Sequence, residues 1–320
     1  MLNLDHQDEA GLTDSIDGRT QLAGSNCMEI LLFSLGTTET FGINVFKVRE
    51  VSTTPFITRT PNMPHGVEGL ISLRGNVIPV LSLAGILGFA PPGAQQKGAM
   101  MVTEYSKRTL GFLVNDVDRI IRVDWEKVRM PENVSGGSNA YITAITELRD
   151  GRLVSILDVE SILANTFGDA AIGNITPIGN GHEVNVFFVD DSAVARRKIT
   201  EVLDKLGVRH KHAQNGLEAW TRLASIADHA DQACRHVADE IDLIMVDAEM
   251  PEMDGYVLTR NIKGDSRFGG IPVVMHSSLS SEANRAMGKR VGVDSYVAKF
   301  DADVLAETLR PLLERARRAA

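Results

Sequence analysis

Acidic side chains follow two strongly apolar runs in the second half of the chain. NVFFVDDSAV, residues 185–194, ends its apolar run on Asp190 and Asp191, and IDLIMVD ends on Asp247. Adjacent carboxylates repel and raise each other's pKa, so the pair calls for a neighbouring positive charge. Carboxylates of this kind can bind a hard cation such as Mg²⁺, and a free one can accept a phosphoryl group.

A hydroxyl and an ammonium group follow two later apolar runs. Ser277 comes directly after IPVVMH, and Lys299 comes directly after SYVA. Phosphoryl transfer depends mainly on positioning and on charge neutralisation, which Mg²⁺ and Lys299 would supply. Taken singly, an Asp at a strand end is more often a helix N-cap and a Lys there is more often solvated. The four placements taken together favour a phosphoryl-transfer site.

The elements that must position these residues alternate from residue 183 onward. The apolar runs predict strands, and the segments between them have helical spacing, including a long amphipathic helix over 216–238. This order predicts an α/β flavodoxin-like (βα)₅ fold with a parallel sheet covered on both faces. The carboxyl ends of its strands share one edge, where such folds bind ligands.

The phrases VDD, VDAEMPEMDG and YVAK, with a hydroxyl after the fourth strand, resemble a two-component receiver (response-regulator) domain over about residues 183–318. The resemblance implies that Asp247 is the phospho-acceptor, that Ser277 bonds the phosphoryl oxygens and that Tyr296 is the switch aromatic. It implies a Mg²⁺ site formed by Asp191 directly, Asp190 through water, Asp247 and the backbone carbonyl of Glu249.

Two features depart from the receiver pattern. Receivers usually have Pro after the lysine, whereas Lys299 is followed by Phe300. The segment between Gly216 and Ile241 is longer than in a minimal receiver, which predicts an extension of the second helix.

The first half of the chain has short runs rich in Val, Ile, Leu and Phe, interrupted by Gly, Pro and Asn. Short strands at close spacing favour an all-β domain built from barrels. No nucleophile, acid or metal cluster of an enzyme is apparent in it. A groove that binds other proteins is the favoured interpretation.

The phrases VFKVREV, GLISLRGNVIPVLSLAGILGF, TLGFLVNDVDRIIRV and GRLVSILDVESIL, in this order, resemble the CheW coupling domain, which has two SH3-like β-barrels around a groove. The resemblance implies that the groove binds the tips of methyl-accepting chemoreceptors and that one barrel binds the CheA histidine kinase. It places Val45, Val48 and Glu50 near the receptor-facing groove and Arg74 in the LRG turn. In the alternative interpretation, Val45 and Val48 are barrel core and Glu50 and Arg74 are an exposed ion pair.

The predicted organisation is a disordered acidic tail over 1–27, a coupling domain over 28–168, a linker over 169–182 and a receiver over 183–320. This order resembles the CheV family of chemotaxis proteins. The formal net charge of −9 argues against nucleic-acid binding, and no apolar run is long enough to insert into a membrane. With only two cysteines, the chain is expected in the cytoplasm. It would reach membrane-bound receptor arrays, with their other coupling proteins, through protein contacts.

The resulting expectation is an adaptor and not an enzyme, apart from the receiver's own Mg²⁺-dependent phosphoryl transfer and autodephosphorylation. Phosphorylation of Asp247 would tune the coupling of receptors to kinase during adaptation. Two alternatives remain open at this stage. The receiver could act mainly as a phosphate sink that drains the kinase, or the chain could regulate a kinase outside chemotaxis.

Overall fold

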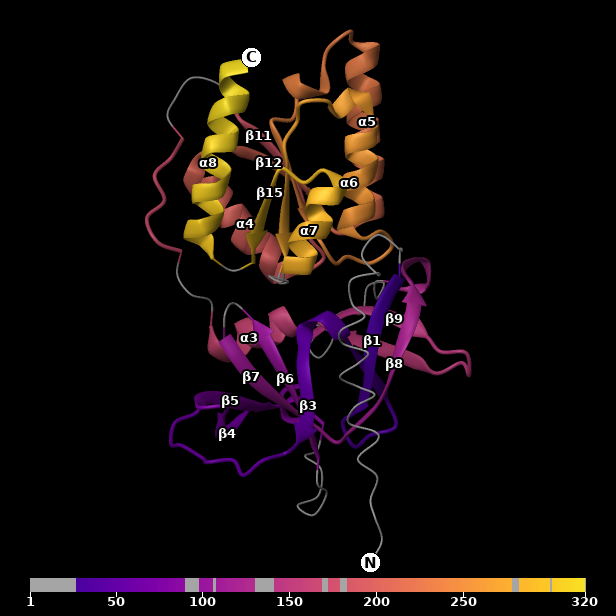
Figure 1. The fold of residues 1–320 in the computed structure, drawn as a ribbon, viewed down its shortest axis with the longest axis vertical. Helices are drawn as coiled ribbons and strands as arrows, with labels where there is room; N and C mark the ends of the chain where they lie inside the picture. Colours follow the sequence, from indigo (N-terminus) through magenta and orange to yellow (C-terminus); the bar gives the residue numbers. More distant parts are fainter. Residues whose placement is uncertain are drawn as a thin grey trace, which may run out of the picture.

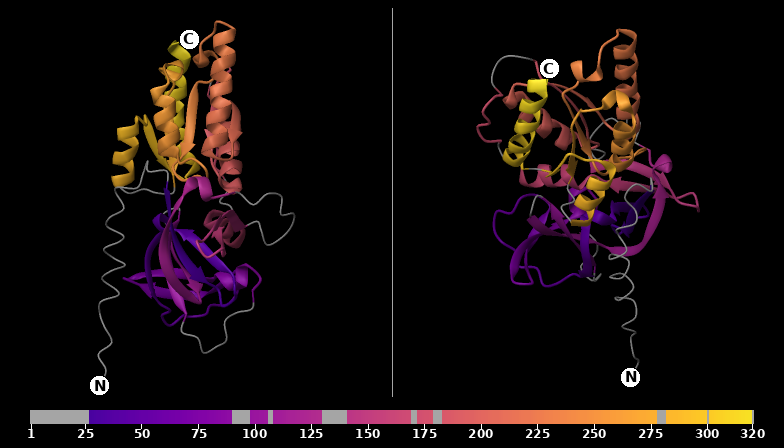
Figure 2. Two further views of the ribbon diagram at one scale, coloured as in Figure 1. Left: turned by 90° about the vertical axis from the view of Figure 1, so that its right-hand side faces the viewer. Right: turned by 45° about the horizontal axis from the view of Figure 1, so that its top comes forward.

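The computed structural model describes residues 27–89, 98–105, 108–129, 141–168, 172–178, 183–277, 282–299 and 301–319. They form an all-β body followed by an α/β body, stacked along the long axis of the molecule (Figures 1 and 2). The predicted acidic tail, except Cys27, lies outside the described residues, as do 169–171 and 179–182 of the predicted linker.

The all-β body contains two five-stranded sheets, as the short apolar runs predict. The first has the order β8-β1-β2-β10-β9, formed by β8 (Asp116–Asp124), β1 (Cys27–Ser34), β2 (Thr40–Asn44), β10 (Leu153–Leu157) and β9 (Ile142–Glu147). The second has the order β3-β6-β7-β5-β4, formed by β3 (Val48–Thr53), β6 (Ala99–Tyr105), β7 (Arg108–Val114), β5 (Asn76–Ser82) and β4 (Val67–Leu73). Short helical turns lie at η2 (Val45–Lys47), α2 (Leu83–Ile86) and η3 (Trp125–Lys127).

Helix α3 (Val159–Phe167) follows β10 and packs into a core shared by both sheets. The Asp158 side chain caps the helix by accepting a hydrogen bond from the backbone N–H of Ser161. Val159, Ile162 and Leu163 share one helix face and enter the core. Figure 1 shows α3 at the end of the all-β body that faces the α/β body.

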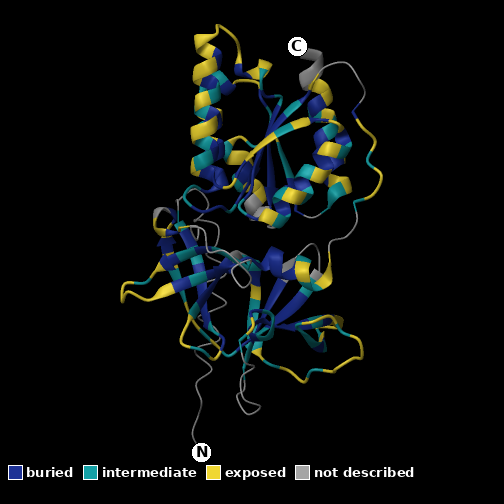
Figure 3. Cartoon of the chain, turned by 180° about the vertical axis from the view of Figure 1, so that it is seen from behind, coloured by how far each residue is buried: buried dark blue, intermediate teal, exposed yellow. Residues whose placement is uncertain are grey.

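The α/β body has one parallel sheet in the order β12-β11-β13-β14-β15, which confirms the predicted (βα)₅ fold. Its strands are β11 (Asn185–Val189), β12 (Arg209–Ala213), β13 (Leu243–Asp247), β14 (Val273–Ser277) and β15 (Ser295–Ala298). Helices α4 (Ala193–Leu206) and α8 (Ala302–Ala319) cover one face, and α5 (Gly216–Gln232), α6 (Gly255–Gly264) and α7 (Glu282–Val291) cover the other (Figure 1). The central strands β11, β13 and β14 are buried, the edge strand β12 is largely exposed, and the helices expose their outer sides (Figure 3). No described helix has the length and apolar character needed to span a membrane.

The prediction of one long helix over 216–238 is wrong at its C-terminal end. Helix α5 ends at Gln232, and Cys234 adopts a left-handed φ of 53° through which an α-helix cannot continue. A short 3₁₀ turn, η5 (Val237–Asp239), follows, and its Asp239 side chain accepts a hydrogen bond from the backbone N–H of His236. The extra length of this region is therefore partly helix and partly a tight turn.

Residues 172–178 of the predicted linker lie against the α/β body. The backbone N–H of Ile178 donates to the carbonyl of Leu206 at 2.8 Å, and Lys205 Nζ donates to the carbonyl of Ile172 at 2.7 Å. The Ile178 side chain joins the core beneath α4 and α8. This part of the segment thus has fixed contacts along α4.

Candidate functional site

The predicted polar residues meet at the edge of the parallel sheet that faces the all-β body. Asp190 follows β11, Asp247 ends β13 and Ser277 ends β14. Lys299 follows β15, and its backbone N–H donates to the carbonyl of Ser277. Asp247 is 3% exposed and Lys299 is 4% exposed. The sheet therefore gathers these side chains in one buried pocket, as expected from the common edge of its strands.

Lys299 supplies the positive charge that the aspartates require. Its Nζ lies 2.8 Å from Asp247 Oδ2 and 2.9 Å from Asp190 Oδ2. Burial alone would lower the pKa of Lys299, but the carboxylates of Asp190 and Asp247 raise it well above the usual value. The ammonium is thus held as a cation between the two carboxylates.

One lysine does not neutralise all three aspartates. Burial raises the pKa of Asp247 well above its usual value although Lys299 opposes the rise, and burial raises the pKa of Asp191 to about 7. The pKa of Asp190 is lowered, because Lys299 and His276 outweigh the effect of its burial. A further cation in the pocket would therefore favour the fully ionised site.

The donor set fits Mg²⁺. Asp190, Asp191 and Asp247 each offer a carboxylate oxygen, and these atoms lie within 4.8 Å of one another. The Oδ2 of Asp190 is buried and faces the Lys299 ammonium at 2.9 Å. Clustered carboxylate oxygens are the ligands that hard divalent cations take. The contribution expected from the backbone carbonyl of Glu249 stays a prediction.

Binding of Mg²⁺ is expected to stabilise the protein against heat. At a hundredfold excess over its dissociation constant the ion should contribute about 2–3 kcal/mol, a rise of several degrees in the unfolding midpoint. Asp191→Asn should lose most of this rise, whereas Glu201→Gln, which changes an exposed acid of α4, should keep it. Differential scanning fluorimetry with MgCl₂ and then EDTA measures both. An equal rise in the two variants would exclude Asp191 as a ligand.

The predicted switch aromatic lies beside the predicted phosphoryl-binding hydroxyl. Burial raises the pKa of Tyr296 to about 12, and a hydrogen bond with Ser277 opposes the rise. The guanidinium carbon of Arg285, on α7, lies 5.5 Å from the centre of the Tyr296 ring. A change at Ser277 can therefore reach α7 through Tyr296. The switching role itself stays a prediction.

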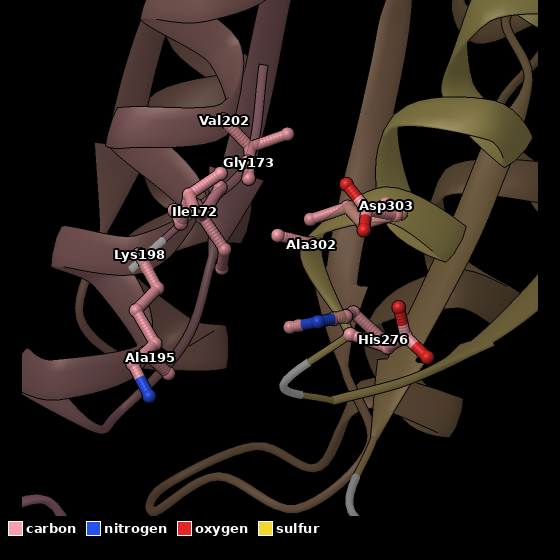
Figure 4. A pocket seen from close by; sticks show the side chains of 11 residues that line it. Ile172, Gly173, Ala195, Lys198, Val202, His276, Ala302 and Asp303 are labelled. Atoms are coloured by element: carbon pink, nitrogen blue, oxygen red, sulfur yellow. The ribbon is translucent and has the colours of Figure 1, made fainter. Parts of the chain in front are cut away.

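A separate cavity of about 200 Å³ lies between α4 and α8 (Figure 4). Residues 172–173 and Lys198 line one side, Asp303 lines the other, and His276 reaches it from the end of β14. His276 Nδ1 lies 3.9 Å from Asp190 Oδ2, and burial lowers the pKa of His276. His276 thus separates this cavity from the aspartate pocket.

The structure does not bring the four predicted partner-binding residues together as one exposed surface. Val45 and Val48 are buried in the shared core, which is the position that the alternative interpretation gives them. Arg74 forms an ion pair with Glu50 and occupies the turn between β4 and β5 with a left-handed φ of 49°. The predicted LRG turn is confirmed, while the receptor-facing role of these residues stays a prediction.

Two residues of the all-β body reach the aspartate pocket, and sequence reasoning missed both. Glu160, in the first turn of α3, is 1% exposed, and its Oε1 lies 3.5 Å from Lys299 Nζ. Lys47 Nζ lies 3.8 Å from the same oxygen. Both residues lie within the quoted phrases VFKVREV and GRLVSILDVESIL, but those phrases carry no information on what the side chains face.

Comparisons with known proteins identify the family of each domain. Residues 29–167 match the CheW-like domain, and residues 186–310 match the response regulator receiver domain. The chain is 30% identical to Chemotaxis protein CheV3 of Helicobacter pylori, over 86% of this chain and 89% of that one. It is 28% identical to Chemotaxis protein CheV1 of the same organism, over 94% and 98%. A solved structure of scaffolding protein TtCheW from Thermoanaerobacter tengcongensis is 28% identical, with a TM-score of 0.40, over 42% of this chain and 87% of that one. A CheW-like domain joined to a receiver, with this identity to CheV3 over most of both chains, shows that the protein belongs to the CheV family of chemotaxis proteins.

Proposed function

We propose that the protein is a chemotaxis adaptor that couples chemoreceptors to the CheA histidine kinase, and that phosphorylation of Asp247 tunes this coupling. The observation that supports the proposal is the position of the buried pocket. Lys299 pairs with Asp247 inside the receiver and with Glu160 of the coupling domain. A chemical change at Asp247 therefore acts directly on a contact between the two domains.

The phosphoryl group would come from a phosphohistidine of the kinase. The P–N bond breaks as a carboxylate oxygen of Asp247 forms a new P–O bond, and the histidine nitrogen keeps the electron pair and takes up a proton. Lys299 and Ser277 would hold the phosphoryl oxygens. Bound Mg²⁺, held by Asp190, Asp191 and Asp247, would supply neutralisation of the added negative charge.

The site of action would be the cytoplasmic face of the receptor array, reached through protein contacts with receptors, kinase and other coupling proteins. A coupling free energy of about 1–3 kcal/mol between Asp247 and the partner surface is enough to change kinase output several-fold. Apart from the receiver's own phosphoryl transfer and autodephosphorylation, no enzymatic activity is required of the chain.

The test is assembly with an isolated kinase regulatory domain and a receptor fragment. Binding is measured with Mg²⁺ alone and with Mg²⁺ plus beryllofluoride, which mimics the phosphoryl group on Asp247. We expect the affinity to change about fivefold or more, and Asp247→Asn to show no change. Assembly with identical affinity in both states would contradict tuning and favour the phosphate-sink function. Failure to assemble at all would point to a pathway outside chemotaxis.

A further inference from the structure

The coupling domain closes over the phosphorylation pocket. A cavity of about 20 Å³ lies between the described parts of the two domains, lined by Lys47 and Trp125 on one side and by Asp191, Glu249 and Pro251 on the other. This volume holds about one water molecule. Because Asp247 itself is only 3% exposed, a phosphohistidine ring on another protein cannot reach it while the domains stay in this arrangement.

Charges cross the closed interface in both directions. The Glu160 carboxylate of the coupling domain lies 3.5 Å from Lys299 of the receiver. Lys47 pairs with Glu160 of its own domain at 3.8 Å, and it lines the interdomain cavity together with Asp191 and Glu249 of the receiver. Burial lowers the pKa of Lys47, but Glu160, Glu249 and Asp191 raise it above its usual value. The coupling domain thus places the buried Glu160 against Lys299 and the partly exposed Lys47 beside Asp191 and Glu249.

We propose that Glu160 and Lys47 form an ionic latch that holds the coupling domain over the pocket, and that phosphorylation of Asp247 releases it. The release rests on the proposed function of Asp247. The latch itself rests only on the contacts of the two domains. It makes Glu160 and Lys47 positioning residues that control access to the phospho-acceptor.

The release follows from competition for Lys299. In the closed protein its ammonium forms ion pairs with Asp247, Asp190 and Glu160 at the same time. A phosphoryl group on Asp247 brings new oxygens to the same ammonium and new negative charge close to Glu160. A buried carboxylate that loses its cation is unfavourable unless water reaches it. Separation of the domains hydrates Glu160, so the phosphorylated receiver favours the open arrangement.

Trp125 provides a readout of the latch, because one side of it lines the cavity between the domains while the rest packs in the core of its own sheet. It is 4% exposed, and the only other tryptophan of the chain is Trp220, on α5. In full-length Trp220→Phe protein, Mg²⁺ plus beryllofluoride is expected to shift Trp125 emission to the red and to increase its quenching by acrylamide. ¹⁹F NMR verifies that beryllofluoride is bound.

Latch variants should open without any phosphoryl mimic. Glu160→Gln and, separately, Lys47→Gln are expected to expose Trp125 in Mg²⁺ alone. They should also accept phosphoryl groups from a phosphorylated kinase domain about tenfold faster, because a donor binds only the open fraction. Glu68→Gln is the matched control. Glu68 lies on β4 of the same domain and forms an exposed ion pair with Arg59. The same Glu-to-Gln change there should leave the protein behaving as the parent.

Two outcomes overturn the latch. The first is Trp125 emission and quenching that do not change when beryllofluoride binds. The second is a Lys47→Gln protein whose Trp125 emission and rate of phosphoryl uptake equal those of the parent protein. This second outcome does not depend on whether Glu160→Gln folds. Failure of the proposed function looks different. Trp125 would then become exposed with beryllofluoride, while affinity for the receptor and kinase fragments stayed constant.

Discussion

Asp247→Asn is expected to abolish phosphoryl uptake by the protein, a loss of about a thousandfold or more. An amide is not a nucleophile, and it removes one carboxylate from the set that fits Mg²⁺. The shape of the side chain is retained, and Lys299 keeps its contact with Asp190 at 2.9 Å. The variant should therefore fold normally while losing the acceptor.

Phosphoryl uptake is measured by transfer of ³²P from a phosphorylated kinase domain to the full-length chain. Asp231→Asn, which changes an exposed aspartate of α5, is the matched control and should accept the label at the parent rate. Retention of ³²P on Asp247→Asn would show that another side chain is the acceptor. Unchanged adaptation in cells carrying the variant would contradict the tuning role even if uptake were lost.

The gathering of the pocket could be predicted because a parallel sheet brings the ends of all its strands to one edge. Asp190, Asp247 and Lys299 each follow an apolar run, and the alternation of runs and helices specifies which end of each strand they occupy. These residues could therefore be predicted to lie together although they are far apart along the chain. The shared edge did not specify contacts, and the pairing of Lys299 with both Asp190 and Asp247 is seen only in the structure.

The residues of the coupling domain that surround the pocket could not be predicted. The spacing of apolar residues shows which face of a helix or strand enters its own core, but it does not show which other domain covers the opposite face. Glu160 has the character of a solvated acid in the first turn of a helix, where it interacts favourably with the helix dipole. The receiver buries it, and this depends on how two domains meet. The position of Lys47 beside the pocket could not be predicted for the same reason.

Local backbone conformation was a second feature that could not be predicted from the sequence. The amphipathic pattern of α5 continues beyond Gln232, but the left-handed conformation at Cys234 ends the helix. Cysteine has no particular preference for this conformation, so its identity gave no indication of the turn. Val45 and Val48 show the opposite case, since apolar side chains allowed both a core and a groove position, and the structure places them in the core.

Gly255→Ala is expected to have the second large effect, on both folding and phosphorylation. A methyl group at this position would overlap the backbone carbonyl oxygen of Asp247 and lie 2.8 Å from its carbonyl carbon. The backbone N–H of Gly255 also donates to the carbonyl of Ala248 at 3.0 Å, so the start of α6 cannot move away without losing this bond. We expect a loss of about 2–4 kcal/mol in the free energy of unfolding, measured by urea denaturation, and slower phosphoryl uptake by the folded fraction.

Gly264→Ala separates this close contact from the general effect of adding a methyl group to α6. Gly264 ends the same helix, and nothing lies within 4 Å of a methyl group placed there. Because alanine favours helix more than glycine, this control should be neutral or stabilising by up to about 1 kcal/mol. Equal stability and equal phosphoryl uptake in the two variants would mean that the backbone of Asp247 can shift without cost. The close packing of α6 against β13 would then not be what fixes the phospho-acceptor in the pocket.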